Sequence, residues 1–148
     1  MAQSLSKVLV HLVFSTKGRM ETLTPEIRAE LFPYFTGILR NVGCTTLRIG
    51  GVEDHVHLLF AISRTLSIAQ VAEKVKTSST KWIKGKWQID FAWQLGYGAF
   101  SVSMGDADRV VAYIKNQEAH HRTTSFQDEF LELLREAGID YDEQFLWD

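Results

Sequence analysis

Residues 53–60 read EDHVHLLF and have the composition of a β-strand that opens just after the turn signal Gly50-Gly51. Side chains alternate between the two faces of a strand, so His55 and His57 are expected on the same face. Two imidazoles on one face of a stiff strand can place their nitrogens around a single divalent metal ion. The alternative is a pair of ordinary hydrogen-bonded histidines near a strand end.

The segments that flank this strand alternate between strand and helix patterns. Residues 7–16 alternate as a strand and end in a basic turn. Thr24-Pro25 has the composition of a helix start, and Gly43 is expected to end that helix. Residues 44–51 then form a second strand, and a capping-box pattern at residues 67–70 opens a second helix.

The second half of the chain continues this alternation. Two short strands are expected at residues 91–94 and 97–103, a third helix from Gly105-Asp106, and a last helix over about residues 125–137. The whole order predicts an α+β fold, a ferredoxin-like split βαβ with an antiparallel sheet and extra C-terminal helices. Two helices would cover one face of this sheet, and His55 and His57 would point to the other, open face.

Composition indicates an ordinary globular chain. It is 45% hydrophobic and 23% charged, and its 148 residues are expected to form one domain, 1–148. No apolar run approaches the length of a membrane span, the N-terminus lacks a signal-peptide pattern, and Cys44 is the only cysteine. We therefore expect a cytoplasmic protein without membrane contact.

The charge is unevenly distributed along the chain. Net charge is −2 overall, but residues 125–148 hold eight acidic residues and one arginine, so residues 1–124 carry net +5. An acidic C-terminal helix and tail, from about residue 125, therefore do not exclude a basic surface that contacts nucleic acid.

Lysines gather on the second helix. Five of them lie between residues 73 and 86, interleaved with hydroxyl and tryptophan side chains that suit phosphate contacts and base stacking. A merely solvated face is the alternative. Together with the basic turn, the nucleic-acid-binding candidates are Lys17, Arg19, Lys76, Lys81, Lys84 and Lys86.

Tyr113 and Gln117 are four residues apart, which would place them on one face of the third helix. Alone, such a pair carries little information. His120 and His121 are expected to bound the helix or contact phosphate rather than metal. His11 is expected to be structural. Asp54 either hydrogen-bonds a ligand imidazole or terminates the turn.

In several stretches the sequence resembles the HUH single-tyrosine transposases of the smallest bacterial insertion sequences. The resemblance covers most of the chain up to His121, and the stretches after it are less characteristic. The stretches that carry it are HLVFSTKGR (11–19), GGVEDHVHLLFAI (50–62), KTSSTKWI (76–83), FAWQLGYGAFSVS (91–103) and YIKNQEAHH (113–121).

The resemblance implies a set of roles. His55, His57 and Gln117 would bind Mg²⁺ or Mn²⁺, and Tyr113 would be the nucleophile that cleaves single-stranded DNA at hairpin-marked ends. The product would be a 5′-phosphotyrosine, whose covalent bond conserves energy for rejoining without a nucleotide cofactor; no Walker-type sequence is present. The resemblance also implies a homodimer whose tyrosine helix can complete the partner's site.

Three alternative functions differ in the residues that they require. A histidine-triad nucleotide hydrolase fails because its third histidine position holds Leu59. A non-catalytic ferredoxin-like nucleic-acid-binding module would keep the basic helix but has no reason to hold Tyr113 and Gln117 beside a histidine pair. A domesticated relative that processes repeated hairpins would retain the whole site, and the sequence does not separate it from a transposase.

Overall fold

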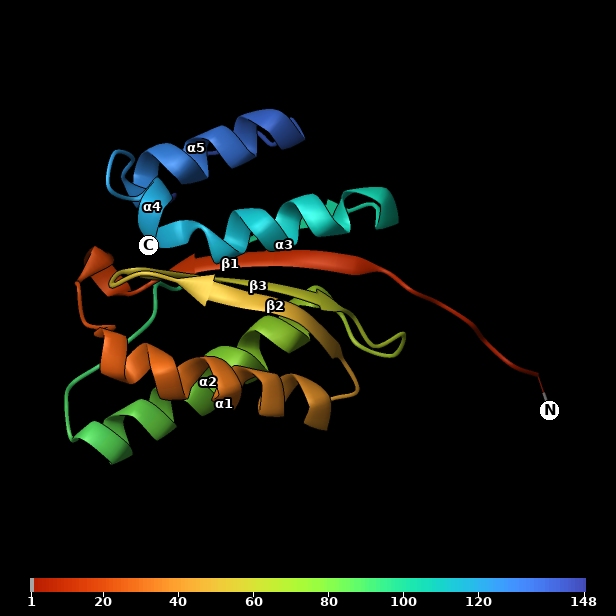
Figure 1. Cartoon of the computed structure of the whole chain (residues 1–148), viewed down its shortest axis with the longest axis horizontal. Coiled ribbons are helices and arrows are strands. Elements are labelled where there is room, and N and C mark those ends of the chain that lie inside the picture. Colours follow the sequence, from red (N-terminus) through yellow and green to blue (C-terminus); the bar gives the residue numbers. More distant parts are fainter. Residues whose placement is uncertain (1) are drawn as a thin grey trace.

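A computed structural model describes residues 2–148, with a four-stranded sheet between two layers of helices (Figure 1). The elements in chain order are β1 (Leu9–Ser15), a 3₁₀ turn η1 (Lys17–Arg19), α1 (Pro25–Asn41), β2 (Thr45–Gly51), β3 (His55–Ala61), α2 (Ile68–Trp87), β4 (Gly98–Val102), a 3₁₀ turn η2 (Met104–Asp106), α3 (Ala107–Lys115), α4 (Gln117–His120) and α5 (Phe126–Ala137).

The sheet has the order β2-β3-β1-β4, and every neighbouring pair is antiparallel. This is the order of a split βαβ fold, so the predicted α+β class and ferredoxin-like arrangement are confirmed. Strand β1 lies in the middle of the sheet, where Val13 pairs with His57 and Ser15 pairs with His55. The histidine strand is therefore held on both edges.

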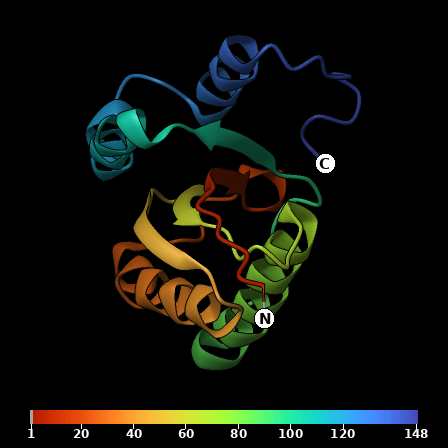
Figure 2. The ribbon, with the colours of Figure 1, turned by 90° about the vertical axis from the view of Figure 1, so that its right-hand side faces the viewer.

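Helices α1 and α2 cover one face of the sheet, where the main core lies (Figure 2). Phe14 on β1 packs edge-on against Phe35 of α1 and against Trp93, whose indole donates to Ser79 of α2. The capping residues expected from the sequence are present at the start of both helices. Thr24 caps α1 with Pro25 at its first position, and Ser67 with Gln70 forms the capping box of α2.

The opposite face of the sheet is covered as well, which corrects the prediction that it would be open. Two smaller apolar clusters lie there between the sheet and helices α3 and α5. Their buried members are Leu9, Leu59, Val110 and Ile114 in one, and Val13, Phe126, Phe130 and Leu134 in the other. The apolar stripes of both helices thus bury against the second face, as amphipathic helices require.

Two element boundaries differ from the sequence prediction. The expected strand over residues 91–94 is reduced to a single bridge between Thr16 and Trp93. The expected third helix does not continue to Gln117, because Asn116 takes a non-helical conformation and α4 starts after it. Asparagine is a weak helix former whose side chain competes for backbone hydrogen bonds, which favours a break at this point.

The acidic C-terminal tail folds back on the domain. Leu146 and Trp147 pack against the cluster of α5, and Arg19 donates to the Trp147 carbonyl at 2.9 Å. The backbone N–H groups of Leu95 and Gly96 donate to the carbonyl of Asp148. Within residues 2–148, no helix combines the length and the apolar character that a bilayer crossing needs.

Candidate active site

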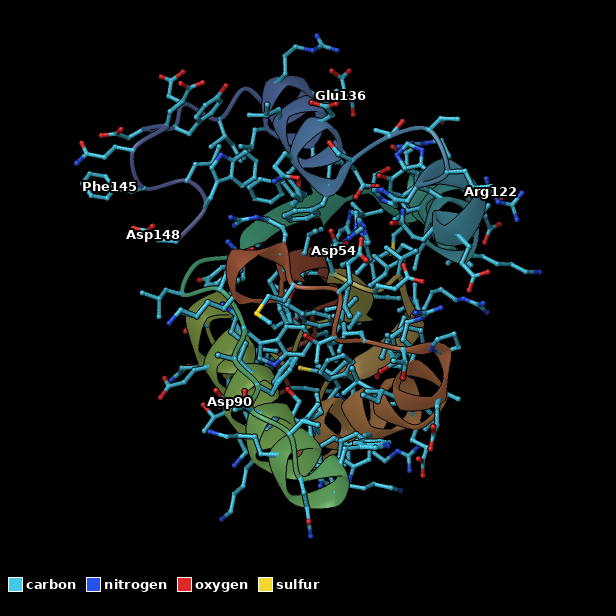
Figure 3. All side chains as sticks on the ribbon, turned by 90° about the vertical axis from the view of Figure 1, so that its left-hand side faces the viewer. Asp54, Asp90, Arg122, Glu136, Phe145 and Asp148 are labelled. Atoms are coloured by element: carbon cyan, nitrogen blue, oxygen red, sulfur yellow. The ribbon has the colours of Figure 1, made fainter. Side chains whose placement is uncertain are left out.

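Strand β3 carries His55 and His57 on the sheet face that lies beneath α3, α4 and α5. Both side chains are fully buried. Figure 3 shows the neighbouring Asp54 at the same level, between the sheet and these helices. Burial of two imidazoles requires polar partners on each ring nitrogen.

In each β3 histidine, Nδ1 forms a hydrogen bond with a neighbouring side chain. Asp54 Oδ1 lies 2.7 Å from His55 Nδ1, so of the two alternatives for Asp54 the hydrogen bond to the imidazole is present. His11 Nε2 lies 2.8 Å from His57 Nδ1, and the two rings stack. In both rings Nε2 is left to face the space beneath α5.

Glu129 of α5 occupies that space. Its Oε1 atom lies 3.2 Å from His55 Nε2, 3.0 Å from His57 Nε2 and 3.2 Å from His121 Nε2. Its Oε2 atom accepts from the Tyr113 hydroxyl and, at 3.1 Å, from Gln117 Nε2. One carboxylate therefore joins the histidines to the tyrosine.

Tyr113 and Gln117 reach the histidines from two consecutive helices. Tyr113 stands near the end of α3, with its ring 5.7 Å from that of His57. Gln117 opens α4, is buried, and places Oε1 at 3.1 Å from His55 Nε2. The structure thus brings His55, His57, Tyr113 and Gln117 together within one chain, although the helix predicted to carry the last two is broken.

Two hollows border Tyr113. One, of about 350 Å³, lies between β4, α3 and α5 and is lined by His11, Phe100 and Arg109 among others. The other, of about 260 Å³, is lined by His120 and by acidic residues of α5.

The electrostatics of the group follow from burial and from these contacts. Burial opposes ionisation of Glu129, but its bonds with the surrounding histidines outweigh it and hold the pKa of Glu129 well below its usual range. Burial also opposes protonation of His55, yet bonds with Asp54 and Glu129 raise its pKa to about 9. Burial and the Glu129 charge raise the pKa of Tyr113 above its ordinary range. Glu129 is therefore the anion of the group, and Tyr113 keeps its proton.

Burial dominates for the other two histidines. It lowers the pKa of His57, and together with the nearby His57 it lowers the pKa of His11 to about 3. His11 is therefore neutral at physiological pH.

The donor set fits a divalent metal ion. His55, His57, His121 and Glu129 each offer one ligand atom, and these four atoms lie within 4.8 Å of one another. His121 Nε2 is buried and has no hydrogen-bond partner of acceptable geometry. Imidazole and carboxylate are ordinary ligands of divalent metals, so the group could hold one.

Sequence reasoning missed Glu129 and did not place His121 in the central group. His121 ends α4, as expected, but its Nε2 also lies 3.2 Å from Glu129 Oε1. Glu129 had a usable signal: it stands three residues after Phe126 and one before Phe130, and is thus a carboxylate on the apolar stripe of α5. An acidic side chain at a core position requires a partner.

The candidate nucleic-acid-binding residues differ in how strongly other groups of the protein already bind them. They lie on the α1–α2 side of the sheet or at its end. Lys76 donates to the carbonyls of Gln94, Leu95 and Gly96, and burial lowers its pKa to about 8. Lys86 pairs with Glu30 of α1. Arg19 is held by Trp147, and Lys17 is exposed.

Lys81 and Lys84 are α2 candidates that border open space. Both are exposed and border an open groove of about 540 Å³ between α2 and the segment before β4. Thr77 and Thr80 also line this groove, which therefore offers ammonium and hydroxyl groups side by side.

The chain is a small α+β domain in which a histidine pair, a tyrosine and a glutamine lie together on one sheet face. A comparison with family models identifies its family. The family model described as "Transposase IS200 like" matches residues 4–117. The chain belongs to this family of transposases.

Solved structures share the fold. A protein from Deinococcus radiodurans R1 described as a transposase is 22% identical, with a TM-score of 0.64 over 79% of this chain and 98% of that one. A REP-associated tyrosine transposase, solved with a bound REP hairpin, is 14% identical, with a TM-score of 0.62 over 82% of this chain and 73% of that one. No curated protein matched in a sequence search.

Proposed function

We propose that this protein is a metal-dependent transposase that cleaves and rejoins single-stranded DNA at hairpin-marked ends through a 5′-phosphotyrosine. The observation that carries the proposal is the convergence of Tyr113, Gln117 and the His55–His57 pair on one buried carboxylate. A phenol held beside a metal-capable histidine pair suits phosphoryl transfer to tyrosine.

In this mechanism the Tyr113 oxygen attacks the phosphorus, and its proton passes toward Glu129 Oε2, which already accepts it in a hydrogen bond. The bond from phosphorus to the 3′ oxygen breaks, and that oxygen takes a proton from water and leaves as a 3′-hydroxyl. His55 and His57 would hold the divalent ion, with Gln117 in the ligand set that the family resemblance implies. A bound Mg²⁺ or Mn²⁺ supplies charge neutralisation at a nonbridging phosphate oxygen. The phosphotyrosine bond preserves the energy needed for rejoining, so no nucleotide is required.

The partner is proposed to be hairpin-bearing single-stranded DNA. Its support is the family membership and the hairpin-bound transposase that shares this fold. The test is incubation with 5′-labelled and 3′-labelled single-stranded hairpin DNA plus Mn²⁺ or Mg²⁺, read on a denaturing gel. A covalent adduct that retains label only from the 3′ side of the cut supports the proposal. Hairpin binding without any adduct would favour a non-catalytic binding module.

A domesticated hairpin-processing relative is the second candidate, since it would use the same residues. Cleavage chemistry does not separate the two. The presence of matching hairpins on both sides of the gene would favour a mobile element, and hairpin repeats scattered elsewhere in the genome would favour the domesticated enzyme.

Neutralising Lys81 and Lys84 together should weaken hairpin binding, because both ammonium groups border the open groove along α2. Each lost phosphate contact should lower the salt-dependence slope by about 1. Fluorescence anisotropy at several salt concentrations measures both effects. Lys86→Gln is the matched control, since Lys86 is paired with Glu30. Unchanged affinity and slope in the double variant would assign Lys81 and Lys84 to a merely solvated face.

Homodimerisation is also proposed, and the geometry favours a dimer whose sites each lie within one chain, because Tyr113 and His57 of the same chain are already adjacent. Tyr113→Phe and His57→Ala chains, co-expressed with different tags and purified as a mixed dimer, should therefore remain inactive. Restored cleavage in the mixed dimer would show that tyrosine and histidines are shared between subunits. Sedimentation of the wild type as a monomer, with and without DNA, would argue against the dimer itself.

A further inference from the structure

Two members of the central donor group, His121 and Glu129, lie beyond the residues that the family model matches. They come from the end of α4 and from the first turn and a half of α5. Neither was expected from the resemblance, which gives two histidines and Gln117. The C-terminal part of the chain therefore brings donors of its own to the site.

The donors converge on one point. Glu129 Oε1 has the three Nε2 atoms of His55, His57 and His121 at 3.0–3.2 Å. In a tetrahedral site with bonds of about 2.1 Å, ligand atoms stand roughly 3.4 Å from one another. The separations between carboxylate and imidazoles are therefore close to those of a four-ligand metal site.

All three imidazoles are oriented in the same manner, with Nδ1 bonded outward and Nε2 facing inward. His55 Nδ1 bonds Asp54, and His57 Nδ1 bonds His11. His121 Nδ1 donates to the carbonyl of Thr124 at 2.5 Å, which leaves Nε2 as the ring nitrogen that faces the group. A hydrogen bond on the second ring nitrogen is the usual companion of a metal-binding histidine. His121 Nε2 is buried without a hydrogen-bond partner, so this nitrogen is available to a ligand. His120 Nε2 also lacks one, but it lies beside the other carboxylate oxygen, 3.4 Å from Glu129 Oε2.

Gln117 has a different relation to the group. Its Nε2 donates to Glu129 Oε2 at 3.1 Å, and the Tyr113 hydroxyl donates to the same oxygen. These two contacts lie on Oε2, with His120 Nε2 at 3.4 Å from the same atom, and leave Oε1 to His55, His57 and His121. Gln117 thus fixes the carboxylate and acts as a positioning residue, in place of the ligand role that the family resemblance implies.

We propose that His121 and Glu129 complete a three-histidine, one-carboxylate metal site with His55 and His57, and that this site selects a transition-metal ion such as Mn²⁺, Co²⁺ or Zn²⁺ over Mg²⁺. The chemistry of the donors supports the selection. Mg²⁺ favours oxygen ligands and retains its water, whereas imidazole suits the transition metals. The proposal rests on the metal dependence of the proposed function and deepens it, by naming the ligands and the class of metal.

Metal binding to the chelator-treated full-length protein tests the ligands without any DNA. Isothermal titration calorimetry should give Co²⁺ and Mn²⁺ dissociation constants well below that of Mg²⁺. His121→Ala and Glu129→Gln should each weaken Co²⁺ binding by more than the roughly 10- to 100-fold typical of losing an outer hydrogen-bond partner. The controls are His120→Ala, which removes the adjacent imidazole, and Glu132→Gln, which removes an exposed carboxylate from the same helix. Both should bind Co²⁺ within a few-fold of the wild type.

A second measurement needs no variant and therefore does not depend on their folding. The chain has five histidines, and in protein labelled with ¹⁵N-histidine, Zn²⁺ should shift the Nε2 resonances of three of them. Shifts confined to two histidines, or wild-type Co²⁺ affinity in both His121→Ala and Glu129→Gln, would overturn the ligand assignment. Mg²⁺ affinity equal to that of Mn²⁺ would overturn the selectivity. In contrast, unchanged metal binding in His55→Ala would contradict the metal site of the proposed function itself.

Discussion

Tyr113→Phe is expected to abolish both cleavage and the covalent DNA adduct, with a loss of more than about 10³-fold, while hairpin binding and metal binding persist. The substitution removes only the attacking oxygen. The ring keeps its place against His57 and His11, so the shape of the site is preserved. The variant also removes one donor from Glu129 Oε2, but Gln117 still holds that atom. Loss of cleavage with retained hairpin and metal binding is the result expected if Tyr113 is the nucleophile.

Denaturing gels with labelled hairpin measure the adduct, and calorimetry measures the metal. Tyr97→Phe and Tyr34→Phe serve as controls, since Tyr97 is exposed beside Lys76 and Tyr34 stacks on Trp82, both away from the histidines. Both control variants should form the adduct. An adduct that survives in Tyr113→Phe would assign the nucleophile to another tyrosine and contradict the mechanism.

His57→Ala is expected to abolish cleavage through loss of the metal, and also to destabilise the fold. Its side chain is fully buried and bonds both His11 and Glu129. Removing it opens a cavity and leaves the Glu129 anion with fewer partners, which together should cost roughly 3 kcal/mol or more of unfolding free energy. Urea denaturation in the presence of chelator measures that free energy without a contribution from bound metal.

A double variant separates the two causes of this loss. His57→Ala combined with Glu129→Gln removes the Glu129 charge, which has lost one partner, but not the cavity, so it should recover part of the stability and none of the cleavage. His55→Ala should also lose cleavage, and raised Mn²⁺ should restore some activity to a single-histidine variant by mass action. If His57→Ala cleaved normally after complete metal removal, the histidine pair would have a structural role only.

Much of the fold and part of the site follow from local patterns. Alternation identified β1 and β3, helix caps at Thr24 and Ser67 located α1 and α2, and their order predicted the split βαβ sheet. The two histidines share a face because a strand has a period of two, and this too is local. Asp54 lies beside His55 because it is the preceding residue, and a hydrogen bond to that ring was one of two alternatives that the sequence left open.

The remaining features depend on contacts between distant segments. That Glu129 lies against His57 depends on how α5 docks on the sheet, and no property of residues 125–137 alone specifies that docking. The same holds for the covered second face, since the apolar stripe of α5 could equally have packed against a partner. The break at Asn116 is a local event, but its effect, to bring Gln117 to His55, is again tertiary.

The strands and helices are synthesised in chain order, and this order has a consequence for the growing chain. A nascent protein that has been synthesised as far as Trp87 contains β1, β2 and β3 with both covering helices, and can pair three of its four strands. It holds His55 and His57 but neither Tyr113 nor Glu129. Pairing of β4 with β1 closes the longest loop in the sheet, and the helices that bear the tyrosine and the carboxylate follow it. A chain that ends before α3 therefore lacks Tyr113 and Glu129 and, by the proposed mechanism, is unable to cleave DNA.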